Sequence, residues 1–407
     1  MDGVKKFTFP ILIIYIWTFL EMFCVIPETM KNFDNTLGTI IPYFTITLKL
    51  KYFIKIFLVI VIICYILLTK KCKIKIDKMV LFLLLRILLS IVQIPLLRLT
   101  NYPASLTNYL LPLIELLLYV AILQIDDMKF CMQMITYANF LALLVAVQVY
   151  LQAIFRVLPI VSFSNVYYKA CMIIPVGGSN FLSVLMLPAL TALLFKKNRS
   201  CTENAFIITL IGSIILTKSR YAIFLLFIIF LYYLFCVNNN NRYSIFYKLI
   251  MIILVGIVIT YVINNKFDNL VSVLHGYSDY VSSGGVLNKI SSGRLGSFQY
   301  YFQRILNHLI LGNGPNYLDS RAHNLIIDIL YQNGLPGLLL FIIILIEIHN
   351  NIKFKNLKYN YFRIIVIVML IQSMGEISFF TAEIADILFF CSLAILNNSV
   401  SRKKGCI

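Results

Sequence analysis

The sequence predicts an all-α protein that crosses a membrane about twelve times and carries one large external loop. Composition is the first observation: 60% of the 407 residues are hydrophobic and 13% are charged, whereas an average soluble domain has about 25% charged residues. Length is the second, because many apolar runs reach the roughly 20 residues that a helix needs to cross the hydrocarbon layer. The third is that lysine and arginine lie between these runs.

The apolar runs give the expected helices in order. They are 9–26, 52–69, 79–97, 106–125, 134–155, 171–195, 204–217, 221–237, 246–263, 324–348, 361–379 and 382–397. The run 37–48 is too short to cross alone and contains Pro42, so we expect an interfacial or re-entrant segment there. The first run lacks a small-x-small cleavage site, which favours an uncleaved helix over a signal peptide.

These runs define one membrane domain with one sizeable loop. Helices one to nine occupy 1–263, the external loop occupies 264–323, and the last three helices and a cytoplasmic tail occupy 324–407. The loop contains no cysteine, so it must be held by packing against the helices. The nine cysteines of the chain form no CxxC pair, and no metal site or cofactor is expected.

Basic residues predict the orientation, because lysine and arginine are retained on the cytoplasmic side of short loops. Both termini are then cytoplasmic and the loop lies outside. The cytoplasmic set is Lys5, Lys6, Lys70, Lys71, Lys73, Lys75, Lys78, Lys129, Lys196, Lys197, Arg199, Arg242, Lys248, Lys353, Lys355, Lys358, Arg363, Arg402, Lys403 and Lys404. This pattern accounts for the net charge of +18, and no nucleic acid is expected as a partner.

The external side is expected to carry a cluster of arginines. Its members are Arg98, Arg156, Arg220, Arg294, Arg304 and Arg321. Orientation alone does not require arginine there, and the guanidinium group suits forked contact with phosphate oxygens. Each arginine taken singly could instead be a snorkelling residue at a helix end, so the argument depends on the cluster.

Polar, glycine-containing segments concentrate on the same side. They are Thr217-Lys218-Ser219-Arg220, Ser291-Ser292-Gly293-Arg294, Leu311-Gly312-Asn313-Gly314-Pro315, Arg321-Ala322-His323-Asn324 and Gly334-Leu335-Pro336-Gly337. Small residues let the backbone approach a ligand, although tight turns are the commoner meaning of such glycines.

In this order and spacing, these segments resemble the O-antigen ligase and repeat-unit polymerase superfamily of bacterial envelope polysaccharide synthesis. The resemblance covers 291–337 at the level of motifs, with Ser219-Arg220 upstream. Two departures are Phe298, where many relatives have tryptophan, and Pro336, where an aliphatic residue is usual. Both positions keep an apolar or turn character.

The resemblance implies a GT-C-like, metal-independent glycosyltransferase. Its donor would be a glycan linked to undecaprenyl pyrophosphate at the outer face of the bacterial cytoplasmic membrane. The implied catalytic residues are Arg220, Arg294 and His323. The implied substrate-binding residues are Lys218, Ser219, Ser292, Gly293, Gly312, Gly314, Arg321, Asn324 and Glu376.

The residues themselves support similar chemistry. The sequence has no P-loop, and the external loop has no DxD-like pair for a metal and a nucleotide sugar. Fixed arginines would stabilise the negative charge that develops on a departing pyrophosphate. His323 could remove the proton of the acceptor hydroxyl, because neutral imidazole accepts a proton near neutral pH; it could also position the acceptor, or cap the helix that follows.

Acidic residues offer a second candidate for the base. Glu376, Glu383 and Asp386 lie at membrane depth, where charge is costly unless paired, so either ion pairs or a catalytic role would explain them. We expect a repeat-unit polymerase, with a ligase that uses lipid A-core as acceptor and a lipid-linked oligosaccharide flippase as alternatives. Expected partners are membrane lipids and, in the same pathway, a chain-length regulator and a flippase.

Overall fold

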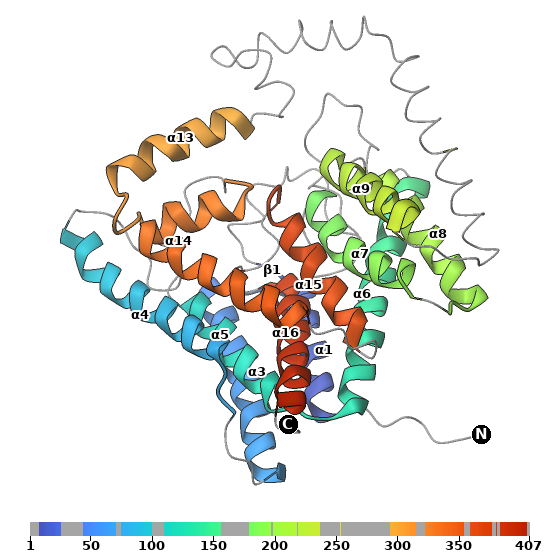
Figure 1. Ribbon diagram of the computed structural model, residues 1–407, viewed down its shortest axis with the longest axis horizontal. Coiled ribbons are helices and arrows are strands. Elements are labelled where there is room, and N and C mark those ends of the chain that lie inside the picture. The colour runs from blue at the N-terminus through green and yellow to red at the C-terminus, as the bar shows by residue number, and fades with distance from the viewer. Residues whose placement is uncertain are drawn as a thin grey trace, which may run out of the picture.

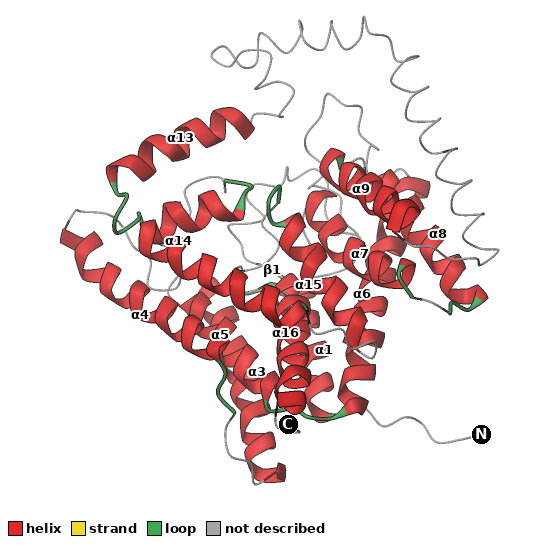
Figure 2. Ribbon diagram, in the orientation of Figure 1, coloured by secondary structure: helices red, strands yellow, loops and turns green. Residues whose placement is uncertain are grey.

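The computed structural model is a bundle of helices (Figures 1 and 2). It describes residues 8–25, 44–70, 75–99, 110–155, 179–196, 198–217, 219–236, 253, 294–314, 322–353, 359–376, 380 and 383–404. Every expected helix except 246–263, which lies outside these residues, corresponds to an observed one. The described residues therefore confirm an all-α fold, with the small exception of two-residue strands.

The elements follow one another along the chain with short connections. They are α1 (Phe9–Phe23), β1 (Cys24–Val25), β2 (Phe44–Thr45), α3 (Leu48–Lys70), α4 (Lys78–Leu99), α5 (Leu110–Leu123), α6 (Met128–Phe155), α7 (Ser179–Leu194), α8 (Cys201–Leu216), α9 (Arg220–Cys236), α13 (Arg294–Asn307), α14 (Leu325–Ile352), α15 (Asn360–Gln372) and α16 (Ile384–Lys404). Strands β1 and β2 pair in parallel, Cys24 with Phe44 and Val25 with Thr45. Most of the expected interfacial segment 37–48 lies outside the described residues.

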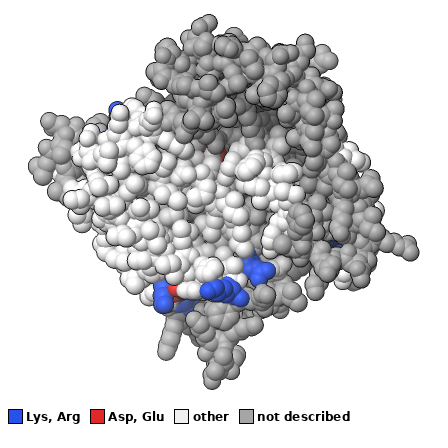
Figure 3. All heavy atoms as spheres, turned by 45° about the horizontal axis from the view of Figure 1, so that its top comes forward, with Lys and Arg blue, Asp and Glu red and all other residues white. Residues whose placement is uncertain are grey.

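Three helices are long and apolar enough to cross a membrane: Leu48–Thr69, Met128–Leu151 and Leu325–Ile352. Seven shorter apolar helices accompany them among the described residues. The chain is therefore an integral membrane protein, and the number of its spanning helices stays a prediction, as does the GT-C-like arrangement. In Figure 3 the described surface is almost free of charge, and basic side chains gather along one edge of it.

One end of the bundle collects the basic residues, and we call it the basic end; it is marked by Lys75, Lys78, Lys129, Lys196 and Lys353. Hydrogen bonds between helix ends show that the chain returns to this end repeatedly. Thr8 Oγ1 at the start of α1 donates to Gln133 Oε1 in the first turns of α6, at 2.6 Å. Asn398 near the end of α16 donates to the carbonyl of Leu123 at the end of α5, at 2.7 Å. The opposite end is called the site end below.

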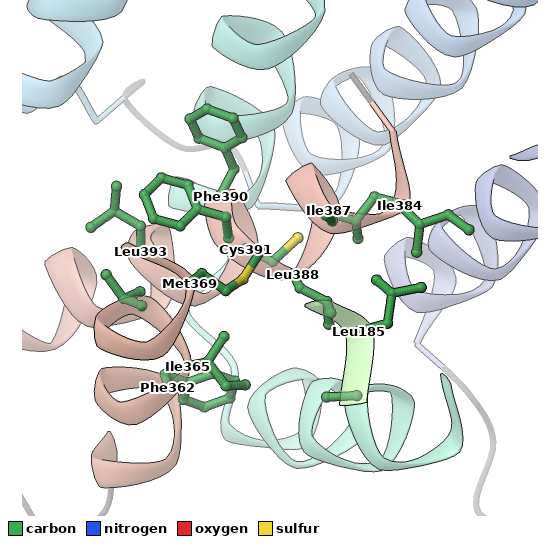
Figure 4. Packing of buried hydrophobic residues seen from close by; sticks show 14 of the residues in the cluster. Leu185, Phe362, Ile365, Met369, Ile384, Ile387, Leu388, Phe390, Cys391 and Leu393 are labelled. Carbon is green, nitrogen blue, oxygen red and sulfur yellow. The ribbon is translucent and has the colours of Figure 1, made fainter. Parts of the chain in front are cut away.

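The core lies where α7, α15 and α16 pack together (Figure 4). Met369 of α15 and Leu185 of α7 are fully buried, and Phe390 and Cys391 of α16 lie beside them. From Ile384 to Ser399 every residue of α16 is buried. Such a helix, apolar on all sides, occupies the centre of a bundle, and here it supports the turn between α15 and α16 that reaches the site end.

Helix α14 is kinked near the site end. Gly334 has φ 63° and ψ −162°, a conformation open almost only to glycine, and Pro336 follows it. The kink divides α14 into a short arm that begins at Leu325 and a longer arm that ends at Ile352. The short arm carries the segment before it, with His323, toward the turn that follows α15.

Candidate functional site

Four segments from distant parts of the sequence meet at the site end. His323 precedes α14, Glu376 lies in the turn after α15, Asn180 is in the first turn of α7, and Ser219 lies between α8 and α9. Hydrogen bonds join their side chains in one continuous row. We call these four residues the polar row.

His323 and Glu376 form the exposed end of the polar row. The Nδ1 atom of His323 lies 3.1 Å from Oε1 and 3.2 Å from Oε2 of Glu376. The His323 side chain is 38% exposed and that of Glu376 is 18% exposed. An ionised carboxylate can only accept hydrogen bonds, so Nδ1 carries the hydrogen and the neutral ring keeps its lone pair on Nε2.

Asn180 and Ser219 form the inner end of the polar row. Asn180 Nδ2 donates to Oε2 of Glu376 at 3.0 Å, and Asn180 Oδ1 accepts from Ser219 Oγ at 2.7 Å. Ser219 is buried, and its Oγ also accepts from the backbone amide of Ala222 at 3.3 Å, within the first turn of α9. The row therefore ties the orientation of the Glu376 carboxylate to the start of α9.

The backbone around His323 is held in an unusual conformation. His323 has φ 53°, in the left-handed region that non-glycine residues seldom adopt. Asn324 stabilises this turn from both sides: its Oδ1 accepts from the amides of Ile326 and Ile327, and its Nδ2 donates to the carbonyl of Met374 at 2.8 Å. Leu325 N donates to the carbonyl of Ser373 at 2.9 Å. Strained backbone over-determined in this way is typical of functional sites.

The segment 309–314 packs against the kink of α14. Asn313 N donates to the carbonyl of Tyr331 at 2.7 Å, and Gly314 N donates to that of Gln332 at 2.9 Å. Gly312 and Gly314 have φ 69° and 76°, and a Cβ on Gly312 would meet the carbonyl oxygen of Gln332. These two glycines therefore have a structural reason to be glycine, whether or not a substrate also approaches them.

Gln93, near the end of α4, stitches this packing together. Its Nε2 donates to the carbonyls of Leu311 and Gln332, and its Oε1 accepts from Asn333 Nδ2 at 3.3 Å. The side chain is fully buried. A buried amide that satisfies two segments at once fixes their relative position, because leaving any of these groups without a partner would be costly.

The polar row lies below the surface of the membrane rather than above it. From Asn180 to Leu194 at the basic end, α7 rises about 21 Å at roughly 1.5 Å per residue, and α15 from Asn360 to Ser373 rises about 20 Å by the same measure. The hydrocarbon layer is about 30 Å thick. The row is thus recessed by roughly a third of that thickness, and Figure 3 shows acidic atoms inside a recess of the described surface.

The structure brings some of the expected site residues together. His323, Glu376 and Ser219 share the polar row, and Asn324 caps α14 beside it. Arg220 begins α9 and Arg294 begins α13, although their side chains are outside the described part. Lys218, Ser292, Gly293 and Arg321 also lie outside it.

Asn180 and Gln93 were missed by sequence reasoning. Each is a single amide near the end of an apolar run, a pattern that occurs at many helix ends and carries no spacing signal. Their partners are distant in the sequence: Asn180 lies 196 positions from Glu376, and Gln93 lies 239 positions from Gln332. Only the fold reveals these contacts.

Other buried charges are paired away from the polar row. Glu21 forms ion pairs with Lys51, at 2.7 Å, and with Lys55. Arg86 pairs with Glu115 and lies 4.1 Å from the ring centre of Phe380. These pairs agree with the expectation that charge within the membrane is compensated. Among the residues described, no group of three or more His, Cys, Asp or Glu side chains could hold a metal ion.

Fold and site together define a class: an integral membrane protein with a histidine–carboxylate pair recessed at the end of the bundle opposite its basic residues. Residues 205–342 match a protein-family model described as O-Antigen ligase. The matched region includes Arg220, Arg294, His323 and the kink of α14, and the match confirms the resemblance to the O-antigen ligase and polymerase superfamily. No curated protein matches the chain significantly.

Proposed function

We propose that the protein is a repeat-unit polymerase, a glycosyltransferase that moves a glycan from polyprenyl pyrophosphate onto a lipid-linked repeat unit. One observation carries the proposal: His323, on a strained turn, directs Nδ1 to Glu376 and leaves Nε2 available. The family match makes glycan transfer of the ligase or polymerase type the natural use of this pair.

The reaction balances with His323 as the base. The acceptor hydroxyl oxygen forms a bond to the anomeric carbon of the donor, and the bond from that carbon to the pyrophosphate oxygen breaks. The hydroxyl proton passes to Nε2 of His323, and the ring is then a cation stabilised by the Glu376 carboxylate 3.1 Å from Nδ1. The polyprenyl pyrophosphate leaves with the bonding electron pair.

The leaving group needs cations rather than a proton. Arg220 and Arg294 are proposed for this role, with Lys218 and Arg321 as further contacts. Ser219 joins the polar row to the residue before Arg220, which supports a place for this arginine near the reacting groups. Charge-assisted hydrogen bonds are worth about 1.5–3 kcal/mol each, so two arginines would lower the barrier by several powers of ten if they act mainly in the transition state.

Orientation follows the positive-inside rule. We place the basic end in the cytoplasm with both termini, and the polar row on the outer side of the bacterial cytoplasmic membrane. The donor is then undecaprenyl pyrophosphate-linked glycan, which is already activated when it arrives. A chain-length regulator and a flippase of the same pathway are proposed as partners.

Two alternatives use the same residues differently. A ligase would transfer the glycan to lipid A-core, and the description of the matching family favours this second candidate directly. Glycan patterns from a deletion strain separate the two: products with a single repeat indicate a polymerase, and unsubstituted core indicates a ligase. A flippase would require cations along a central path through many helices.

The experiment compares two arginines of the same helix. In the deletion strain, wild-type protein and Arg304→Ala should restore long-chain glycan, because Arg304 stacks on Tyr300 at 4.2 Å and has no assigned role in transfer. Arg294→Ala should fail to restore it while remaining in the membrane at the wild-type level. Restoration of normal ladders by Arg294→Ala would overturn the proposal.

A further inference from the structure

Helix α13 has a two-sided surface that differs from those of the spanning helices. Its sequence RLGSFQYYFQRILN places Phe298, Tyr301, Phe302, Ile305 and Leu306 on one face at helical spacing. Gln299, Gln303, Arg304 and Asn307 occupy the other face. Figure 1 shows α13 beyond α14, at the edge of the bundle.

The protein buries only half of this apolar face. Tyr301 and Ile305 are each 2% exposed and pack with Ala322 and Tyr331. The rings of Tyr301 and Tyr331 meet edge to face, with their centres 5.0 Å apart. This contact attaches α13 to the short arm of α14.

The other half of the apolar face has no cover from the protein. Phe302 is 48% exposed and Leu306 is 69% exposed, and Ile310, just after the helix, is 69% exposed. Their spacing of four residues aligns them in a row, which we call the α13 stripe.

The α13 stripe continues into a surface that faces lipid. Leu335 N donates to the carbonyl of Leu309 at 2.9 Å, so Ile310 lies beside the kink of α14. Beyond the kink, the exposed apolar residues Leu335, Leu339, Ile342, Ile343 and Ile346 line a helix long enough to cross the membrane.

The level of the stripe in the bilayer follows from α14. From Leu335 to Ile352 at the basic end, α14 rises about 26 Å at roughly 1.5 Å per residue. The hydrocarbon layer is about 30 Å thick, so Ile310 lies near its boundary at the site end. A helix attached at this level, with one apolar and one polar face, suits the interface between lipid tails and headgroups.

We propose that α13 is an interfacial helix whose stripe, Phe302, Leu306 and Ile310, inserts into the lipid leaflet at the site end. The polar face then points to water, with the guanidinium of Arg304 held against the Tyr300 ring at 4.2 Å. Arg294 is the first residue of α13. Anchoring the helix in the interface therefore fixes the level at which the preceding external segment enters the membrane surface.

Tryptophan fluorescence in proteoliposomes tests this directly, because the sequence has a single tryptophan, Trp17, which is buried. Leu306→Trp probes the stripe, and Gln303→Trp, on the polar face of the same helix, is the matched control. Vesicles of phosphatidylcholine with and without brominated acyl chains supply the quencher. The added emission is obtained by subtracting that of the wild-type protein.

We expect the Leu306→Trp emission to be blue-shifted and to lose at least twice as large a fraction to brominated lipid as that of Gln303→Trp. Phe302→Trp should behave like Leu306→Trp, which guards against a local failure of one variant. Equal quenching at positions 303 and 306 would overturn the proposal. So would a blue-shifted but unquenched signal at 306, which indicates cover by protein, such as a second copy of the chain.

Discussion

At the scale of single residues, Glu376 determines what His323 can do. Its carboxylate receives Nδ1 of His323 from one side and the amide of Asn180 from the other. This arrangement selects one neutral form of the imidazole and holds the ring in place. Glu376 is therefore assigned a positioning role, which deepens the substrate-binding role expected from the sequence.

Replacement of Glu376 by glutamine tests this role, because it keeps the size and removes the negative charge. The glutamine amide group can donate toward Nδ1, which favours hydrogen on Nε2 and leaves no base facing the acceptor. We expect transfer to slow by roughly 10²-fold, within the usual contribution of general base catalysis. Initial rates of glycan transfer by purified protein in lipid nanodiscs measure the effect.

Glu347→Gln is the matched control for this substitution. Glu347 lies near the basic end, where its Oε2 is 3.8 Å from Lys78 Nζ. Its loss should leave the rate within a factor of two. A Glu376→Gln enzyme as fast as this control would show that the carboxylate does not set the state of His323.

Much of the polar row could be predicted from local sequence. His323-Asn324 and Ser219-Arg220 stood in recognisable segments, and Glu376 was conspicuous as a carboxyl group at membrane depth. Asn180 could not be predicted, because its role exists only through contacts with Glu376 and Ser219 across the bundle. An isolated amide at a helix start gives no sign of such partners.

At the scale of elements, the kink of α14 connects the site to the segment 309–314. A Cβ on Gly334 would lie 2.5 Å from the carbonyl oxygen of Ile310 and 2.7 Å from Gly312 N. The backbone of Gly334 is also in a region almost closed to other residues. Neither requirement can be met by alanine without moving one of the two segments.

Gly334→Ala should therefore destabilise the protein by about 1–3 kcal/mol, the range for a residue forced into such a conformation. Thermal unfolding in detergent, followed by circular dichroism, measures the loss. Leu335→Ala is the control, since Leu335 is an exposed neighbour and its truncation should shift the midpoint little. Equal midpoints for the two variants would contradict the assigned role of the kink.

Helix positions followed from hydropathy, and bends did not. The expected range 324–348 corresponds to α14 at Leu325–Ile352, and the short run 204–217 corresponds to α8 at Cys201–Leu216. The glycine-rich segment 334–337 was recognised as a motif, but its partner could not be. That partner, 309–314, depends on backbone hydrogen bonds between segments that hydropathy does not relate.

At the scale of the whole molecule, the basic end and the polar row lie at opposite ends of the bundle. This separation was predicted from the alternation of basic residues, because charge retention acts on each loop independently of packing. The depth of the row was not predicted, since it depends on how far the short helices α7 and α15 reach. An acceptor must therefore descend about 10 Å into the membrane to meet His323, given a layer about 30 Å thick.

Metal independence is a further expectation for the molecule as a whole. If guanidinium groups stabilise the pyrophosphate, addition of a chelator to purified protein should leave the rate of transfer unchanged. Restoration of activity by Mg²⁺ or Mn²⁺ after a chelator had abolished it would assign the leaving-group charge to a metal ion instead.

The central claim is that His323 takes the proton of the acceptor hydroxyl, and single-turnover transfer in nanodiscs tests it most directly. His308→Ala is the control, because His308 lies beyond the end of α13, outside the polar row. We predict that His323→Ala slows the chemical step by about 10²–10⁴-fold while His308→Ala retains the wild-type rate. A His323→Ala protein that transfers glycan as fast as the His308→Ala control would contradict the account.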